Sequence, residues 1–347
     1  MTTRTAPLRL GVFTRLLDET TPGVRYRNAL EQIERAEGLG YNSAWVAQHH
    51  FHAAEGGLPA PAVFLAAAAA RTSRIRLGFG IITLPLEHPL RVAEDLAVLD
   101  EISGGRVEVG FGTGGTPSSF RAFGFDAANR REIYADHLKV VTDAWSGKDI
   151  GDPENQLYPP APTLLQRQWE ATFSAEGAAR GGANGSGLML SRTQPRPEGN
   201  PDATIWEIQE SVVDAYLNAL PSGVAPRIAA SRTVFVADDE ATALREAERG
   251  LRRFAEGGKG GGGLWGLRPE ASLEELLART DSVVGTPEQV AEKLAKDTII
   301  SRATDLLVQV HSIDPVHELV LRSHELLARE VAPGLGWVNS NLVGATA

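Results

Sequence analysis

The chain has 347 residues, 42% of them hydrophobic and 22% charged, which suffices for one large or two smaller globular domains. Its formal net charge of −10 argues against nucleic acid or an anionic membrane as the main partner, since both attract basic surfaces. The absence of cysteine excludes disulfides, thiolate metal ligands and cysteine nucleophiles. Without a signal-peptide pattern or a long apolar stretch, we expect a cytoplasmic protein that does not span a membrane.

Short apolar runs rich in β-branched residues alternate with longer helical patterns along the chain. Eight such runs predict strands, at 8–13, 43–48, 75–84, 106–114, 169–174, 187–192, 227–237 and 304–312. A helical pattern follows each run, and repeated strand–helix pairs imply a parallel sheet. Eight pairs favour a closed (β/α)8 TIM barrel of the α/β class, and we expect a single domain over residues 1–347.

Two segments interrupt this repeat. The Pro-rich stretch at 151–162 predicts a surface hairpin or loop. The segment at about 255–285, with its "GGKGGGG" run, lies between the seventh and eighth predicted strands. Long insertions in compact folds are often binding loops, so we expect an extended Gly-rich lid there. Thr286 followed by Pro287 then predicts the start of a helix.

Three histidines, His49, His50 and His52, follow the second predicted strand in the string "WVAQHHFHAAEGGLP". A zinc site, a proton-transfer site and a plain strand end all fit this string. Adjacent residues of an extended chain point to opposite sides, and no cysteine or obvious fourth ligand is near, so we expect no metal. His49 is a candidate for proton handling because imidazole titrates near neutrality, whereas His52 is expected only to hydrogen-bond the loop.

Other candidates collect after the strands, where barrels of this kind place their chemistry. Ser174 and Gly177 begin the helix after the fifth strand, whose free N–H groups suit a phosphate, although Ser174 also fits a plain N-cap. Arg131 and Tyr134 share one face of the preceding helix, where the arginine fits either a phosphate contact or a solvent salt bridge. "GFGTGG" at 110–115 lacks the ending of a P-loop, but its small residues would let a flat ring approach the strand.

Several motifs resemble bacterial luciferase and its flavin-dependent monooxygenase relatives. They are "WVAQHHF", "GFGIITLPLEHPLRVAEDLAVLDEISGGRVEVGFGTGG", "FRAFGFD", "ATFSAEGAARGGANGSGLMLSR" and "VVGTPEQVAEKL". The resemblance is densest from about 40 to 147 and weakest at 193–226 and in the Gly-rich segment. It implies a (β/α)8 barrel that binds reduced FMN delivered by a separate flavin reductase. O2 would add to the flavin as a C4a-peroxyflavin, which then oxidises a small organic substrate.

The resemblance also implies roles for individual residues. His49 matches the first histidine of the luciferase "HHF" and would stabilise or protonate the peroxyflavin and assist its attack on the substrate. His50 would line the pocket wall or contact the substrate. Gly80–Ile81 matches a non-proline cis peptide that lies against the flavin ring. The implied phosphate contacts are Arg131, Ser174, the Gly177 amide and, from some relatives, Tyr134.

Four positions depart from the luciferase pattern. Gln48 replaces the acidic residue before the paired histidines, which puts carboxylate tuning of His49 in doubt. Thr113 stands where luciferase has a phosphate-binding arginine, although "TGG" occurs in sulfonate-oxidising relatives. Gly112 takes the place of a reactive cysteine near the flavin, and Phe173 replaces an acidic residue, leaving only its backbone to bind. These changes argue against a light-emitting luciferase but leave flavin binding expected.

Two other functions fit the same fold. One is an oxidoreductase that uses the deazaflavin coenzyme F420 for hydride transfer without oxygen, and the other is a non-catalytic flavin-binding protein. The histidine pair favours the monooxygenase, because hydride transfer needs no peroxide stabiliser, and a retained His49 with an extended lid argues against a purely binding role. The helices at 60–73 and 91–103 are apolar and rich in small residues, which fits ordinary packing onto the barrel. They also correspond to the helices through which relatives dimerise, which implies a homodimer.

Overall fold

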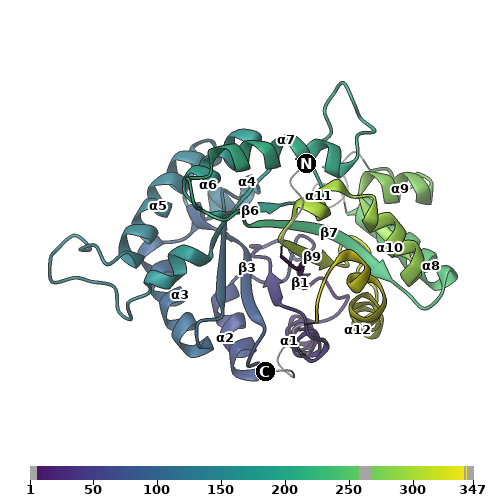
Figure 1. Cartoon of the computed structure of the whole chain (residues 1–347), viewed down its shortest axis with the longest axis horizontal. Helices are drawn as coiled ribbons and strands as arrows, with labels where there is room; N and C mark the ends of the chain where they lie inside the picture. Colours follow the sequence, from purple (N-terminus) through teal and green to yellow (C-terminus); the bar gives the residue numbers. More distant parts are fainter. Residues whose placement is uncertain (1–5, 258–266, 340, 342–347) are drawn as a thin grey trace.

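The computed structural model describes residues 6–257, 267–339 and 341. Parallel strands form a closed barrel, shown with its surrounding helices in Figure 1. The eight barrel strands are β1 (Arg9–Thr14), β2 (Ser43–Val46), β3 (Arg76–Thr83), β4 (Val107–Gly112), β5 (Gln168–Thr172), β6 (Gly187–Leu190), β7 (Ile228–Val236) and β9 (Asp305–Gln309). The barrel closes where β1 pairs with β9, with Arg9 opposite Asp305. All eight strands predicted from the sequence are present, and the fold is the expected (β/α)8 TIM barrel.

A helix follows each barrel strand and covers its outer face. These are α1 (Pro22–Leu39), α2 (Pro61–Arg71), α3 (Pro89–Ser103), α5 (Arg130–Trp145), α6 (Ala175–Ala183), α7 (Ile205–Ala219), α8 (Glu240–Glu256) and α12 (His317–Leu326). The first three begin at proline, whose fixed φ and missing N–H suit the first helical position. No helix in the described ranges is long and apolar enough to cross a membrane.

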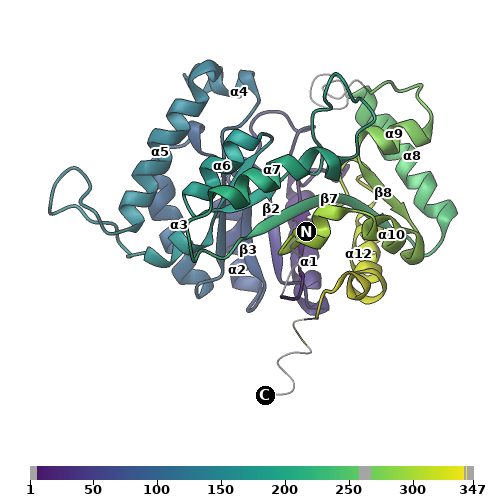
Figure 2. The same cartoon turned by 45° about the horizontal axis from the view of Figure 1, so that its top comes forward.

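Shorter helices extend this pattern. They are α4 (Pro117–Ala122), α9 (Leu273–Arg279), α10 (Pro287–Ala295) and α11 (Thr298–Arg302), with 3-10 turns η1 (Leu84–Leu86), η2 (Ala127–Asn129), η3 (Pro162–Arg167) and η7 (Ala332–Leu335), and the π-helical turn η6 (Leu327–Val331). Thr286 caps α10 through a reciprocal bond with Gln289, which confirms the helix start expected there. Residues 151–162 form turns that extend away from the barrel, as expected for a surface loop (Figure 2).

A ninth strand, β8 (Ser282–Gly285), was not predicted from the sequence. It pairs with the second half of β7, whereas β6 pairs with the first half up to Ala230. Thr233 lies opposite both Ser282 and Gln309, so β8 and β9 pair with opposite edges of β7. β8 therefore pairs with the same edge of β7 as β6 does, but further along the strand. The expected insertion at 255–285 therefore contains α9 and β8, while its Gly-rich lid falls largely on residues 258–266, outside the described residues.

The barrel interior is filled by large side chains that neighbouring glycines accommodate. Trp45 and Trp169 meet edge to face at 5.8 Å. A Cβ atom on Gly78 would overlap the ring of Trp45, and one on Gly187 the ring of Trp169. Burial of each indole contributes a few kcal/mol at about 25 cal/mol per Å². This packing fills the interior and leaves the strand ends for polar residues.

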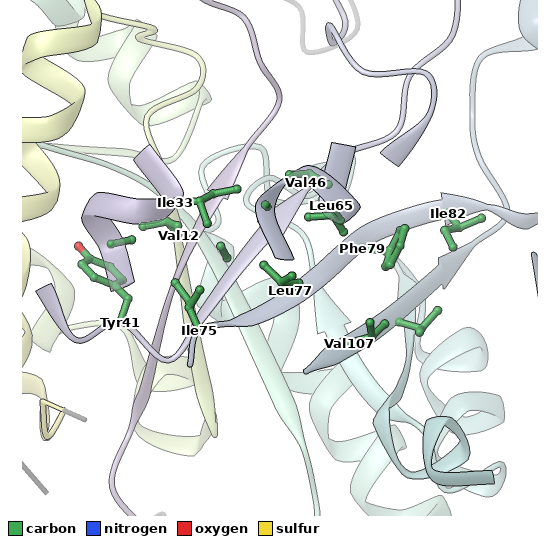
Figure 3. Packing of buried hydrophobic residues seen from close by; sticks show 14 of the residues in the cluster. Val12, Ile33, Tyr41, Val46, Leu65, Ile75, Leu77, Phe79, Ile82 and Val107 are labelled. Carbon is green, nitrogen blue, oxygen red and sulfur yellow. The ribbon is translucent and has the colours of Figure 1, made fainter. Parts of the chain in front are cut away.

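A second apolar layer lies between the barrel and its helices. Figure 3 shows Val12, Val46, Leu77, Phe79 and Val107 of β1 to β4 beside Ile33 of α1 and Leu65 of α2. Both faces of these strands are thus buried, which explains why their sequences are continuously apolar.

Candidate active site

The carboxyl ends of the parallel strands meet at one end of the barrel, here called the barrel mouth. Most residues singled out in the sequence lie there. His49 and His50 follow β2, Gly80–Ile81 lies in β3, Gly112 ends β4, and Ser174 follows β5. The barrel thus gathers groups from four strands.

His49 is held at both ring nitrogens. Its Nε2 lies 3.0 Å from a guanidinium nitrogen of Arg15. A guanidinium only donates, so Nε2 accepts and the ring proton is on Nδ1, which lies 3.8 Å from Glu55 Oε2. Thr116 Oγ1 donates to the same Glu55 oxygen at 2.9 Å. Burial, followed by repulsion from Arg15, lowers the pKa of His49 to about 4, so the ring is neutral at neutral pH.

Arg15 and Glu55 were not identified from the sequence. Arg15 also donates to the backbone carbonyl of Glu55, with Nε at 2.9 Å, and burial lowers its own pKa. The nearby ring of His49 lowers the pKa of Glu55. A charged residue directly after a barrel strand, as Arg15 is, was the available signal.

The Gln48 side chain has a structural role and hydrogen-bonds Thr83 and Glu87. Its side-chain carbonyl accepts from the backbone N–H of Thr83 at 2.8 Å, and its amide donates to Glu87 at 2.6 Å. It ties the ends of β2 and β3 together. The carboxylate beside His49 is instead supplied by Glu55.

The other two histidines differ from His49. The ring of His50 lies edge-on to Phe123 at 4.9 Å, and its buried Nε2 has no hydrogen-bond partner in the described part of the chain. Burial lowers the pKa of His50. His52 Nε2 lies 2.8 Å from Ser118 Oγ of α4, so its partner is a hydroxyl on a helix and not the loop expected from the sequence. Within the described ranges, no three His, Asp or Glu side chains are arranged to hold a metal ion.

β3 and β4 present a narrow, glycine-lined surface. The Gly80–Ile81 peptide is cis, as the resemblance implied. A Cβ atom on Gly80 would overlap the ring of Phe13, and one on Gly112 would lie 2.9 Å from the Ile81 side chain. Thr113, partly exposed, follows directly. The missing side chains at Gly80 and Gly112 thus let Phe13 and Ile81 pack directly against the backbone of β3 and β4.

The start of α6 is a tight turn. Ser174 caps the helix and accepts from the Gly177 N–H at 3.1 Å. A Cβ atom on Gly177 would overlap Thr172 Oγ1, so only glycine fits. Phe173 is 56% exposed and offers the site only its backbone, whose carbonyl accepts from Gln194 at 3.4 Å.

α5 lies next to α6. The Tyr134 hydroxyl donates to Glu170 Oε2 at 3.0 Å, and the Arg180 guanidinium of α6 lies over its ring at 5.8 Å. Burial raises the pKa of Tyr134, and its hydroxyl is engaged inward rather than free for a phosphate. Arg131, one turn earlier on the same face, is exposed and has no ion-pair partner among the described residues.

A (β/α)8 barrel with convergent polar groups at its mouth defines an enzyme of the TIM-barrel class. A family model described as luciferase-like monooxygenase matches residues 8–300. The chain therefore belongs to the luciferase-like monooxygenase family.

The similar proteins support this membership. The chain is 31% identical to 4-hydroxyprotoasukamycin monooxygenase of Streptomyces nodosus subsp. asukaensis, over 94% of this chain and 90% of the relative. Limonene 1,2-monooxygenase of Rhodococcus erythropolis is 28% identical, over 88% of this chain and 80% of the relative. The crystal structure of monooxygenase RslO1 from Streptomyces bottropensis superposes with a TM-score of 0.75 at 26% identity, over 94% and 99%. The protein is thus a monooxygenase, which takes O2 and an organic substrate.

Two more distant structures bear on the cofactor. The oxygenating constituent of 3,6-diketocamphane monooxygenase from Pseudomonas putida, in complex with FMN, has a TM-score of 0.71 at 21% identity, over 94% and 98%. A coenzyme F420-dependent tetrahydromethanopterin reductase from Methanopyrus kandleri has a TM-score of 0.64 at 18% identity, over 95% and 100%. At these identities the likeness shows the fold alone. The comparisons support a flavin-type cofactor and do not distinguish FMN from F420.

Proposed function

We propose that this protein is a two-component FMN-dependent monooxygenase. It would take reduced FMN from a separate flavin reductase and use O2 to oxidise a small organic substrate. The observation that carries this proposal is the neutral His49, fixed between Arg15 and Glu55 at the barrel mouth. Bound reduced FMN would supply the electrons that activate O2, whereas hydride transfer has no need of such a histidine.

The residues at the mouth fit a flat ring with a phosphate tail. Gly80–Ile81 and Gly112 offer the narrow surface for the ring. At the start of α6 the Gly177 N–H donates to Ser174 Oγ, and an anion at this helix N-terminus would take over that bond and accept from the Ser174 hydroxyl as well. Arg131 is on α5, whose Tyr134 contacts Arg180 of α6, and it can add a bidentate contact to the phosphate. Thr113 follows β4 and Phe173 follows β5, and Thr113 and the Phe173 backbone complete the proposed set of cofactor contacts.

The protonation state of His49 refines its proposed role. With a pKa of about 4, it carries no proton to donate from Nε2 at neutral pH. We therefore assign His49 to positioning Arg15, because its single acceptor atom, Nε2, already accepts from that guanidinium. Arg15 provides a fixed positive charge beside it, and such preorganised charge stabilises negative charge that develops during a reaction. His50, with its unpartnered Nε2 against Phe123, is proposed to contact the substrate.

Binding of FMN and riboflavin tests the cofactor site, with the quenching of tryptophan fluorescence as readout. Arg131→Ala should weaken FMN binding at least tenfold and leave riboflavin binding nearly unchanged, because only FMN carries a phosphate. The matched control is Arg329→Ala, an exposed arginine whose partner is Glu325. Equal losses for both ligands would refute the phosphate role of Arg131.

Oxygen uptake separates the two cofactors. Protein-bound reduced FMN should consume O2, and His49→Ala should retain FMN affinity but release more hydrogen peroxide in place of oxidised substrate. Tight binding of reduced F420, with no O2 uptake from reduced FMN, would instead favour the hydride-transfer alternative. FMN binding without turnover on any substrate would favour a binding protein.

A homodimer is also proposed. α2 and α3 expose apolar side chains, with Val63 of α2 74% exposed and Ile102 and Val98 of α3 59% and 45% exposed. An exposed apolar face of this kind is typical of a protein interface. Light scattering should give twice the 37.1 kDa chain mass.

A further inference from the structure

Arg192, the second residue after β6, is a buried charge with few contacts. It is 6% exposed, and the one hydrogen bond that it makes within the described residues runs from Nη1 to Thr233 Oγ1 at 3.3 Å. A guanidinium has five N–H donors, and no carboxylate of the described residues lies within ion-pair distance of this one. Burial, followed by repulsion from Arg15, lowers the pKa of Arg192 to about 9, so it stays charged at neutral pH. A buried cation without a direct counter-ion is costly unless a ligand supplies one.

The two carboxylates that raise the pKa of Arg192 contact other groups, although Asp281 keeps one buried oxygen without a hydrogen-bond partner among the described residues. Asp281 forms an ion pair with Arg196 at 2.6 Å. Asp314 Oδ2 lies 2.7 Å from Nδ1 of His311, the residue two positions after β9. Both carboxylates raise the pKa of Arg192 from a distance, but neither contacts it. Among the described residues, most N–H groups of the Arg192 guanidinium therefore have no acceptor.

Arg192 lies where the barrel wall divides. The pairing of β6 with β7 ends at Leu190 and Ala230, and β8 begins to pair with β7 only at Thr233. Arg192 leaves β6 at this division and reaches across to Thr233. The ring of Phe254 lies 5.9 Å from its guanidinium and provides an apolar wall.

Arg15 connects this position to His49. It follows β1, repels Arg192, and contacts His49 Nε2 at 3.0 Å. β1, β9, β7 and β6 are consecutive around the barrel, so the two arginines belong to one side of the mouth. The proposed phosphate contacts follow β4 and β5 instead.

We propose that Arg192 recognises an anionic oxygen group on the organic substrate, such as a carboxylate. Its guanidinium would bind this group in a bidentate manner, with Phe254 packing against the carbon skeleton. Arg15 would add positive charge between that group and His49. The inference rests on the proposed function, because it assumes that the substrate is oxidised at the barrel mouth.

A pair of probes of equal shape and different charge tests this assignment. Calorimetry with the full chain, without and with saturating oxidised FMN, compares 2-naphthoate with its neutral isostere 2-naphthamide. The unaltered protein should bind 2-naphthoate at least tenfold more tightly. Arg192→Gln should abolish this preference and leave 2-naphthamide binding unchanged, whereas the control Arg329→Gln should change neither.

Other outcomes overturn the proposal. Equal affinities for the two probes, or a preference that survives Arg192→Gln, would show that Arg192 does not select an anion. If Arg192→Gln weakened FMN but not riboflavin, the arginine would hold the cofactor phosphate, and this inference would fail while the proposed function stood. Loss of FMN binding in Arg131→Ala concerns the proposed function alone. Should Arg192→Gln not fold, Arg192→Lys keeps the charge, and its loss of the bidentate contact should weaken 2-naphthoate severalfold.

Discussion

Burial and two charged neighbours, one of them from a distant part of the chain, set the state of His49. Arg15 lies 34 residues earlier and fixes the tautomer by donating to Nε2, while Glu55 faces Nδ1. The two charges act on the pKa of His49 in opposite directions, since Arg15 lowers it and Glu55 raises it. The histidine can therefore be tuned from either side.

The opposite effects of Arg15 and Glu55 on the pKa of His49 give a direct prediction. Arg15→Gln should raise the pKa of His49 from about 4 toward its ordinary value of 6.5, because a repulsive charge is removed. Glu55→Gln should lower it further. NMR titration of the imidazole carbons measures both, and a shift of the same sign in the two variants would contradict the arrangement described.

Local motifs identified part of the candidate site. The positions of His49, Gly80–Ile81 and Ser174 at the mouth follow from their place after or within predicted strands. Arg15 and Arg192 were missed because their significance depends on contacts across the barrel, which no local pattern encodes. Tyr134 was expected at a phosphate for its helical spacing, but its hydroxyl binds Glu170 in β5.

The eight barrel strands were predictable because each is covered by packing on both faces and therefore has an apolar run. β8 was not, because its four residues lie within a segment interpreted as an insertion and are too few to show an alternating pattern. The start of α6 was predictable as a helix, but the reason for its glycine was not. That reason is the overlap of a Cβ atom on Gly177 with Thr172, the last residue of β5.

The close packing of α6 against β5 therefore depends on the absence of a side chain at Gly177. Gly177→Ala should push the first turn of α6 away from β5, destabilising the protein by about 1–3 kcal/mol and weakening FMN binding more than riboflavin binding. Gly199→Ala is the matched control, since its added Cβ would meet nothing within 4 Å. Chemical denaturation and fluorescence titration measure the two effects, and equal stability of both variants would contradict this packing.

Buried neutral histidines make the molecule as a whole sensitive to acid. Burial lowers the pKa of His49 to about 4, of His311 to about 3 and of His324 to about 4. Each takes up a proton near pH 6.5 once the chain unfolds, so the unfolded state binds more protons between about pH 6.5 and 4. The stabilisation is complete above pH 6.5 and is lost as the pH falls.

We expect the free energy of unfolding to decrease below pH 6.5 by up to about 1.4 kcal/mol per pH unit for each of these histidines. Urea denaturation across this range measures the slope. His324→Gln should make the slope shallower by about one proton, whereas His88→Gln at an exposed position should leave it unchanged. A slope that His324→Gln does not alter would show that this ring is not buried in its neutral form.

β7 has three partners, β6, β9 and β8, and this arrangement has an evolutionary consequence. Residues 237–281 leave the end of β7 and return through β8 to the same strand, so both ends of this excursion are anchored on one ladder of backbone hydrogen bonds. We expect that the sequence between these two anchors can be exchanged as a unit while the eight-stranded wall keeps its pairing, which makes this segment a starting point for directed evolution of the protein.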